Sequence, residues 1–171
     1  MADVAKNKIL QFLPNANTGF INKKGQDILI SVVDQPRESI IDWVNEACIK
    51  EKIPLICGAL DWKWALYYSI IPGKTGCIEC WKINAKKSNL LFHELIREKE
   101  FLKAASPNVA IAPLIAILTG LILTDLLKII TGIEEPKSLG KLQAFDFHTT
   151  TISTLESWDV NPNCVICQNS I

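Results

Sequence analysis

Two Cys-x-x-Cys pairs constrain the fold of this chain more than any other feature of its sequence. Cys77 and Cys80 lie in GCIEC, and Cys164 and Cys167 lie in NCVIC near the C-terminus. Four cysteines at this spacing suit one tetrahedral zinc ion, with each pair holding the metal from a tight turn. Because four cysteine ligands leave no open position for water or substrate, the predicted zinc is structural. It would fasten the C-terminal region to the middle of the chain.

Two other interpretations of the cysteines stay open at this point. Cysteines also occur in ordinary cores as small apolar groups, and Cys48 and Cys57 fit that description because they fall within an apolar helix face and an apolar strand. Disulfides would need an oxidising compartment. The N-terminal stretch MADVAKNKILQFLPN has no continuous apolar run followed by a small-residue cleavage site. We therefore expect reduced thiols and a cytoplasmic location.

The composition favours one packed domain. The 171 residues are 49% hydrophobic, which is enough for a sizeable core. The 18 basic and 18 acidic residues balance, and no long basic run offers a surface for nucleic acid. The apolar stretch from 108 to 132 is interrupted by Pro113 and Gly120 and reaches Asp125. We predict a buried helix that ends at Gly132, and no membrane span.

The first part of the chain predicts a strand–helix–strand crossover. Residues 27–33 form a β-branched apolar run typical of a parallel strand buried on both faces, and residues 53–59 form a second such run. Apolar residues from Ile40 to Cys48 recur at helical spacing between them. Such units place ligands at the carboxyl ends of their strands, where Asp34 and Gly58 are expected.

The later part predicts antiparallel structure around the cysteines. WALYYSI is a strand that runs into a Pro-Gly turn, and this turn leads to the first cysteine pair. Residues 84–106 are charged and partly helical, as in a surface excursion. KLQAFDFH and TTISTLES alternate apolar and polar positions like a hairpin with His148 in its turn, and the second pair follows. His93 is interpreted as a residue on a helix surface.

This order of parts resembles the C-terminal half of the ThiF/MoeB superfamily, the adenylyltransferases related to ubiquitin-activating enzymes. The segments that match are VVDQP with the VNEAC helix, IPLICGA, IPGKTGCIEC, DLLKIITG, GKLQAFDF and NPNCVIC. The resemblance implies an α/β fold with a partial Rossmann-like sheet, a C-terminal antiparallel hairpin and a four-cysteine structural zinc. IPGKTGCIEC looks most like the branch that adenylates microcin-type peptides.

The resemblance also implies an activity and its residues. Members of this family transfer AMP from ATP to the C-terminal carboxylate of a small protein or peptide. Asp34 matches the catalytic aspartate that binds magnesium, and Lys8 in DVAKNK matches the lysine that contacts ATP phosphates, with Ala5 where glycine is usual. The alternatives are a turn-forming aspartate and a solvated lysine. Residues 81–163 contain no cysteine, so only carboxylate activation without later thiol transfer is expected.

One part of the family's architecture is missing. No Gly-x-Gly-x-x-Gly occurs in the chain, so residues 1–171 are predicted to form a single ThiF-type domain without the N-terminal nucleotide-binding half. The expected partners are a small protein or peptide substrate, a separately encoded N-terminal half, and a second copy in a homodimer. The alternative function is a non-catalytic, zinc-stabilised module for peptide binding or dimerisation.

Overall fold

The computed structural model describes residues 28–33, 38–61, 63–88 and 111–168. Within these ranges, five strands form one sheet in the order β1-β2-β3-β4-β5. They are β1 (Leu29–Val33), β2 (Leu55–Asp61), β3 (Trp64–Ile70), β4 (Lys141–Asp146) and β5 (Thr151–Ser157). Only β1 and β2 are parallel, and the other neighbours pair antiparallel. The fold is therefore mixed α/β.

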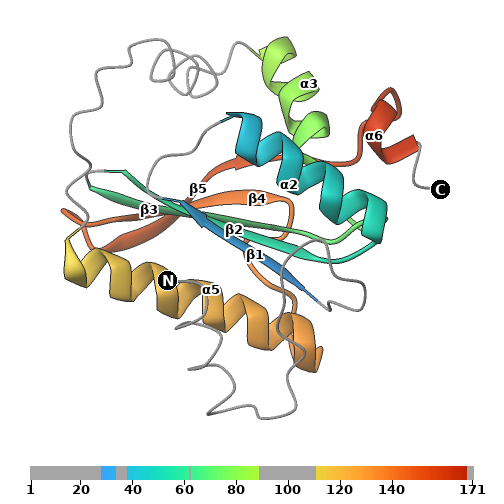
Figure 1. Ribbon diagram of the computed structural model, residues 1–171. Coiled ribbons are helices and arrows are strands. Elements are labelled where there is room, and N and C mark those ends of the chain that lie inside the picture. Colours follow the sequence, from blue (N-terminus) through green and yellow to red (C-terminus); the bar gives the residue numbers. More distant parts are fainter. Residues whose placement is uncertain (1–27, 34–37, 62, 89–110, 169–171) are drawn as a thin grey trace.

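Helices cover both faces of this sheet. They are α2 (Glu38–Glu51), α3 (Ile78–Ser88), α5 (Ala112–Thr131) and α6 (Val165–Gln168). Figure 1 shows α2, α3 and α6 on one side of the sheet and α5 on the other. Successive side chains of β2 alternate between two hydrophobic clusters, with Leu55 and Cys57 on the α2 side and Ile56 and Leu60 on the α5 side.

The predicted strand–helix–strand crossover is confirmed as β1–α2–β2, with Leu29 opposite Leu55. Gly58, however, lies in the middle of β2 and pairs with Val32, so its expected place at a strand end was wrong. A Cβ at Gly58 would come within 2.6 Å of Ile122 Cδ1 on α5. The glycine therefore lets α5 approach the sheet closely.

The prediction that β1 is buried on both faces was also wrong. β1 is an edge strand of the described sheet, and α5 packs mainly on β2 and β3. Ile30 and Val32 point to the α5 side but lie beyond the cover of that helix, and they are 42% and 54% exposed. One face of β1 is consequently open.

The apolar helix is confirmed but is buried on one face only. It ends as predicted at Gly132, which has φ 65° and donates its N–H to Lys128 O at 2.9 Å. Leu118, Ile122 and Asp125 are among the residues that face the sheet, whereas Leu127 is 60% exposed. Among the described residues, α5 alone is long and apolar enough to cross a membrane, with a mean hydropathy of 2.1. Since its buried face packs on β2 and β3, α5 is part of the domain.

The predicted C-terminal hairpin is confirmed as β4 and β5, with His148 in the turn between them. The pairing shifts register between Leu142 and Gln143. The charged excursion predicted for 84–106 begins within α3, and its part after Ser88 lies outside the described residues, as does His93.

Candidate metal centre and the carboxyl edge of the sheet

The four predicted cysteines come together at one point. The Sγ atoms of Cys77, Cys80, Cys164 and Cys167 all lie within 4.8 Å of one another. Cys77 Sγ is 3.9 Å from Cys80 Sγ and 3.6 Å from Cys164 Sγ, and Cys80 Sγ is 3.6 Å from Cys167 Sγ. Four sulfurs at about 2.3 Å from a tetrahedral zinc would be about 3.8 Å apart. The cluster therefore has the dimensions of a four-cysteine metal site.

None of the cysteines is bonded to another. All six are free, and the sulfurs of the cluster are too far apart for a disulfide of about 2.05 Å. Cys48 and Cys57 lie apart in the core, where burial raises the pKa of each thiol to about 12. Thiols with such raised pKa values are poor nucleophiles near neutral pH. Their interpretation as core residues agrees with the structure.

The two pairs have the same local geometry. Cys77 precedes α3 and Cys80 lies in its first turn, whereas Cys164 precedes α6 and Cys167 lies within it. The carbonyl of Cys77 accepts the N–H of Trp81 at 3.1 Å, and the carbonyl of Cys164 accepts the N–H of Gln168 at 3.1 Å. Each pair thus sits at the start of a helix, with both sulfurs on one side of a single turn.

The burial of the cysteines and the contacts between their sulfurs favour the binding of a cation. Cys77, Cys80 and Cys164 are fully buried. Hydrogen bonding between the sulfurs raises the pKa of Cys77, and the same contact with Cys77 lowers the pKa of Cys80 to about 5. The backbone N–H of Asn161 also donates to Cys80 Sγ at 3.3 Å. Four thiolates in this space would repel one another without a metal ion, and a divalent cation would neutralise part of that charge.

A tight backbone contact holds the first cysteine turn. A Cβ on Gly76 would lie 2.4 Å from Asp159 O and 2.7 Å from Asp159 C, so only glycine fits beside this segment. The indole N–H of the buried Trp158 donates to Gly76 O at 3.0 Å. The ring of Trp158 also contacts those of Tyr68 and Trp81, with centroid distances of 5.9 Å and 6.3 Å. The turn before Cys77 is therefore fixed against the segment that leads to the second pair.

The helix α2 supports the same turn from the other side. Asn45 is 1% exposed, and its Oδ1 accepts the N–H of Ile78 at 2.9 Å, at the start of α3. Lys82 on α3 forms an ion pair with Asp42 on α2 at 2.6 Å. These contacts couple the position of the cysteines to the crossover helix.

The residues predicted to bind the nucleotide lie outside the described residues. Lys8 and Asp34 are both in this group. The parallel strands β1 and β2 end at Val33 and Asp61, on the same edge of the sheet. This carboxyl edge is where open α/β sheets bind ligands.

One buried polar group was missed by the sequence analysis. Asp125 on α5 is 4% exposed and accepts a hydrogen bond from Ser138 Oγ, whose oxygen lies 2.7 Å from Ser69 Oγ. Burial raises the pKa of the Asp125 carboxyl above its usual range. The spacing of Leu118, Ile122 and Asp125 already puts the aspartate on the buried face of the helix. This group fastens α5 to β3.

The fold of this chain has counterparts in known proteins. Protein HesA from Leptolyngbya boryana is 29% identical over 136 residues, a match that covers 75% of this chain and 40% of that protein. The structure of E. coli MccB with AMPCPP and selenomethionine-labelled MccA matches with a TM-score of 0.65 and 26% identity, covering 82% of this chain and 39% of that one. MccB with ATP matches with a TM-score of 0.73 and 23% identity, covering 98% of this chain and 51% of that one.

These matches share one property. The chain itself is largely covered, but it spans only about half the length, or less, of the proteins that it resembles. The model of the ThiF family matches residues 3–166, which is nearly the whole chain. The chain therefore belongs to the ThiF family.

Proposed function

We propose that this chain is the zinc-bearing half of an adenylyltransferase that uses ATP to activate the C-terminal carboxylate of a peptide or a small ubiquitin-like protein. The proposal rests on the family match over residues 3–166. The similarity to MccB, which has been solved with ATP and with the peptide MccA, favours a peptide among the possible substrates.

The chemistry is a nucleotidyl transfer in which atoms balance. A carboxylate oxygen of the substrate attacks the α-phosphorus of ATP, the bond from that phosphorus to the bridging oxygen breaks, and pyrophosphate leaves with the electron pair. In our proposal Asp34 holds magnesium on the phosphates, because magnesium prefers one or two carboxylates together with substrate oxygens. Lys8 supplies positive charge to the leaving pyrophosphate.

The zinc has a structural role in this proposal. Cys77, Cys80, Cys164 and Cys167 hold it, and the ion ties α6 to the start of α3 with no position left for substrate. Because Asn45 and the Lys82–Asp42 pair link α3 to α2, the metal also steadies the helix that follows Asp34 in the chain.

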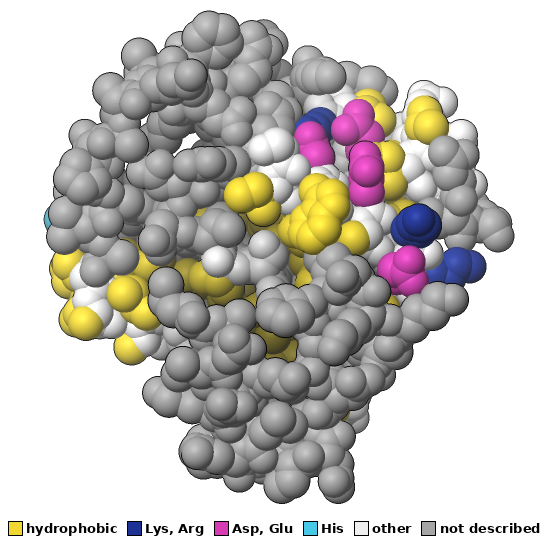
Figure 2. Space-filling model, viewed as in Figure 1, with side chains coloured by type: hydrophobic (Ala, Val, Ile, Leu, Met, Phe, Trp, Pro, Cys, Tyr) yellow, Lys and Arg dark blue, Asp and Glu magenta, His cyan; other side chains and the backbone are white. Residues whose placement is uncertain are grey.

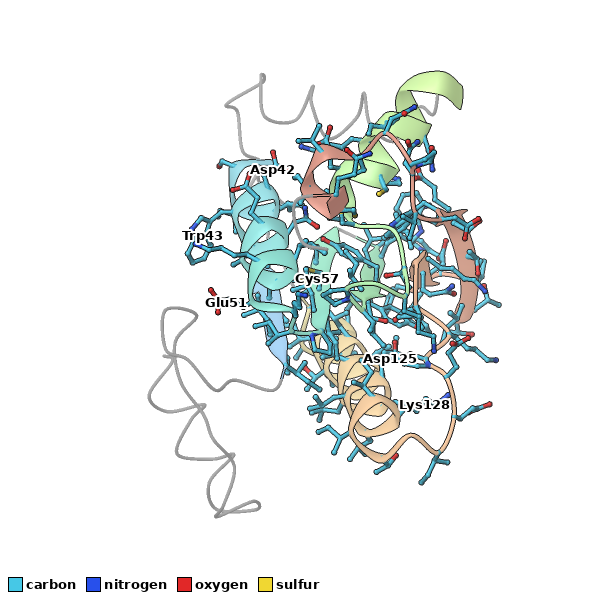
Figure 3. All side chains as sticks on the ribbon, turned by 90° about the vertical axis from the view of Figure 1, so that its right-hand side faces the viewer. Asp42, Trp43, Glu51, Cys57, Asp125 and Lys128 are labelled. Carbon is cyan, nitrogen blue, oxygen red and sulfur yellow. The ribbon has the colours of Figure 1, made fainter. Side chains whose placement is uncertain are left out.

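The open edge of the described sheet favours a partner that adds a strand beside β1. β1 has no neighbour on its outer side among the described strands, and Ile30 and Val32 are exposed on its α5 face. On its other side, α2 exposes Trp43, which points away from the body of the domain in Figure 3. Figure 2 shows exposed hydrophobic side chains over α2. We propose that a separately encoded half, with the glycine-rich turn, adds a strand beside β1 and covers both faces.

A second candidate function, without catalysis, follows from a motif that the given sequence does not contain. The sequence has no Gly-x-Gly-x-x-Gly, which the family uses for phosphate binding at a helix N-terminus. A non-catalytic module that keeps only the metal-stabilised surface is therefore the alternative.

Calorimetric titration with magnesium and ATP separates these functions. The chain is titrated alone and after addition of the part of HesA from Leptolyngbya boryana that lies outside the matched region. Heat of binding in the mixture, lost in Asp34→Asn but kept in the exposed α2 control Glu46→Gln, supports the enzyme. No heat in either titration favours the non-catalytic module.

The metal is tested independently of the nucleotide. We expect one zinc per chain by elemental mass spectrometry, with the metal lost from Cys80→Ser and kept in Cys48→Ser, which alters a buried cysteine outside the cluster. A chain that is folded without bound metal would contradict the zinc assignment.

A further inference from the structure

The four cysteines of the metal centre differ in their access to solvent. Cys77, Cys80 and Cys164 are 0% exposed, whereas Cys167 is partly exposed. Cys167 lies in α6, whose first residue, Val165, is 63% exposed. Figure 1 shows α6 at the outside of the domain, next to α2. A small solute in the surrounding water therefore reaches one residue of the cluster and not the other three.

The sulfurs of the cluster are in contact across the two pairs. Cys80 Sγ lies 3.6 Å from Cys167 Sγ, and Cys77 Sγ lies 3.6 Å from Cys164 Sγ. The second contact joins two fully buried residues, so only the first includes a residue that meets solvent. A disulfide has about 2.05 Å between its sulfurs, so Cys80 and Cys167 at 3.6 Å are about 1.5 Å from bonding distance.

The short helix α6 is the part that can make this movement. It has only four residues, and none of them is buried. The hydrogen bond from Gln168 N to Cys164 O lies within its own turn. Cys80, by contrast, belongs to the eleven-residue helix α3, which is fixed to α2 through Asn45 and through the Lys82–Asp42 ion pair. Cys167 can therefore approach Cys80 without a change in the core.

We propose that Cys167 is a site of oxidation by peroxides, and that oxidation ends in a disulfide with Cys80 that replaces the metal as the cross-link. Both residues are thiolates when they ligate a metal. The Cys167 thiolate attacks one oxygen of hydrogen peroxide, the O–O bond breaks, and hydroxide leaves, which gives a sulfenic acid on Cys167.

The second step forms the disulfide. The Cys80 thiolate attacks the Cys167 sulfur, the S–O bond breaks, and a second hydroxide leaves with its electron pair. The two sulfurs have then lost two electrons, and the peroxide has gained them. Two protons from solvent convert the two hydroxides to water, so atoms and charges balance.

The product keeps the chain closed while it gives up the metal. Only Cys77 and Cys164 remain as ligands, which is too few for a tetrahedral site. Cys80 and Cys167 are 87 residues apart in the sequence, and so are Cys77 and Cys164. The disulfide therefore closes the same length of chain as the metal did. This inference rests on the proposed metal, and it stands whether or not the chain binds ATP.

Metal release and peptide mapping on the full, zinc-loaded chain test the proposal. Zinc is counted by elemental mass spectrometry before hydrogen peroxide is added, and released zinc is followed with a chromogenic chelator. We expect the free thiols of the denatured chain to fall from six to four as one zinc leaves. Mass spectrometry should find the Cys80–Cys167 disulfide, and dithiothreitol with added zinc should restore the starting state. The control Cys48→Ser, outside the cluster, should release zinc as fast as wild type.

Two variants separate the two steps. Cys167→His leaves three cysteines and one histidine, a set that zinc accepts, and it should release zinc at least ~10-fold more slowly because the remaining cysteines are buried. Cys80→His removes the partner sulfur and keeps the same number of ligands. In this variant Cys167 should stay a sulfenic acid that dimedone labels.

Melting temperatures test the exchange of cross-links. The oxidised chain should melt about 10 °C above the reduced, metal-free chain, because the disulfide restricts the denatured ensemble over the same loop. Equal melting temperatures would overturn the exchange. A first disulfide between any other two cysteines, or zinc release from Cys167→His at the wild-type rate, would overturn the oxidation site. A chain that holds no zinc before peroxide is added would contradict the metal assignment and this inference with it, whatever the outcome with ATP.

Discussion

Substitution to alanine is expected to change the stability of the domain differently at three of its glycines. At Gly76, the new Cβ would lie 2.4 Å and 2.7 Å from backbone atoms of Asp159, closer than real Cβ atoms approach, so the backbone must move. We expect Gly76→Ala to lower the free energy of unfolding by about 3 kcal/mol, at the upper end of overpacking effects. At Gly120 nothing lies within 4 Å, and the residue is inside a helix. Gly120→Ala should therefore raise the free energy of unfolding by about 1 kcal/mol.

Gly58 lies between these two cases. Its Cβ would meet the flexible tips of Ile122 and Leu118 at 2.6 Å and 3.3 Å, which can move more easily than backbone. We expect Gly58→Ala to cost about 1 kcal/mol.

Thermal and urea unfolding followed by circular dichroism measure this series. For a domain of this size 1 kcal/mol corresponds to about 2–4 °C, so the midpoint should fall by about 6–12 °C in Gly76→Ala and rise by about 2–4 °C in Gly120→Ala. All variants are compared at one protein concentration, because self-association would make the midpoint depend on it. Gly76→Ala should also bind zinc more weakly, since the turn before Cys77 is displaced. If Gly76→Ala were as stable as Gly120→Ala, the close approach of the two backbone segments would be refuted.

Three further predictions concern the buried polar groups. Ser138→Ala removes the donor to buried Asp125 and should cost about 1–3 kcal/mol in urea unfolding, with wild-type-like stability counting against the hydrogen bond. Burial raises the pKa of Asp125, so the stability that this group contributes is present below about pH 4 and is lost as pH rises through the raised pKa. Relative to wild type, Asp125→Asn should therefore gain stability between about pH 4 and pH 7, and a constant difference would contradict this. Asn45→Ala leaves the N–H of Ile78 buried without its acceptor and should cost about 1–3 kcal/mol in the same assay, whereas the exposed Glu46→Ala should change little.

The sequence predicted those features that depend on neighbouring residues. The β1–α2–β2 crossover follows from two β-branched runs around a helical repeat, and the hairpin β4–β5 follows from alternation on both sides of a short turn. The meeting of the two cysteine pairs was predicted because the chemistry of zinc demands four ligands. Asp34 and Lys8 stay predictions that rest on resemblance.

Features that depend on distant contacts were missed or misjudged. Ile30 and Val32 have the composition of a fully covered strand, and nothing local to them tells where α5 stops. Asp125 was used only as a charge that interrupts the apolar stretch. Its burial was missed because its partner Ser138 lies in a different part of the chain. The exposure of one apolar face of α5 was missed for the same reason. The sequence of an apolar helix does not tell whether the core of its own domain or another surface covers each face.

The separation of the two cysteine pairs has a consequence for the unfolded chain. Cys77 and Cys164 are 87 residues apart in the sequence, and α5 with both strands of the hairpin lies between them. A metal that stays bound to both pairs closes this segment into a loop, and the chain-entropy relation for a cross-link over such a loop gives about 4.6 kcal/mol. Most of that effect comes from restricting the denatured ensemble, with no new contact in the folded domain. Removing the metal would therefore weaken even those parts of the fold that lie far from the cysteines.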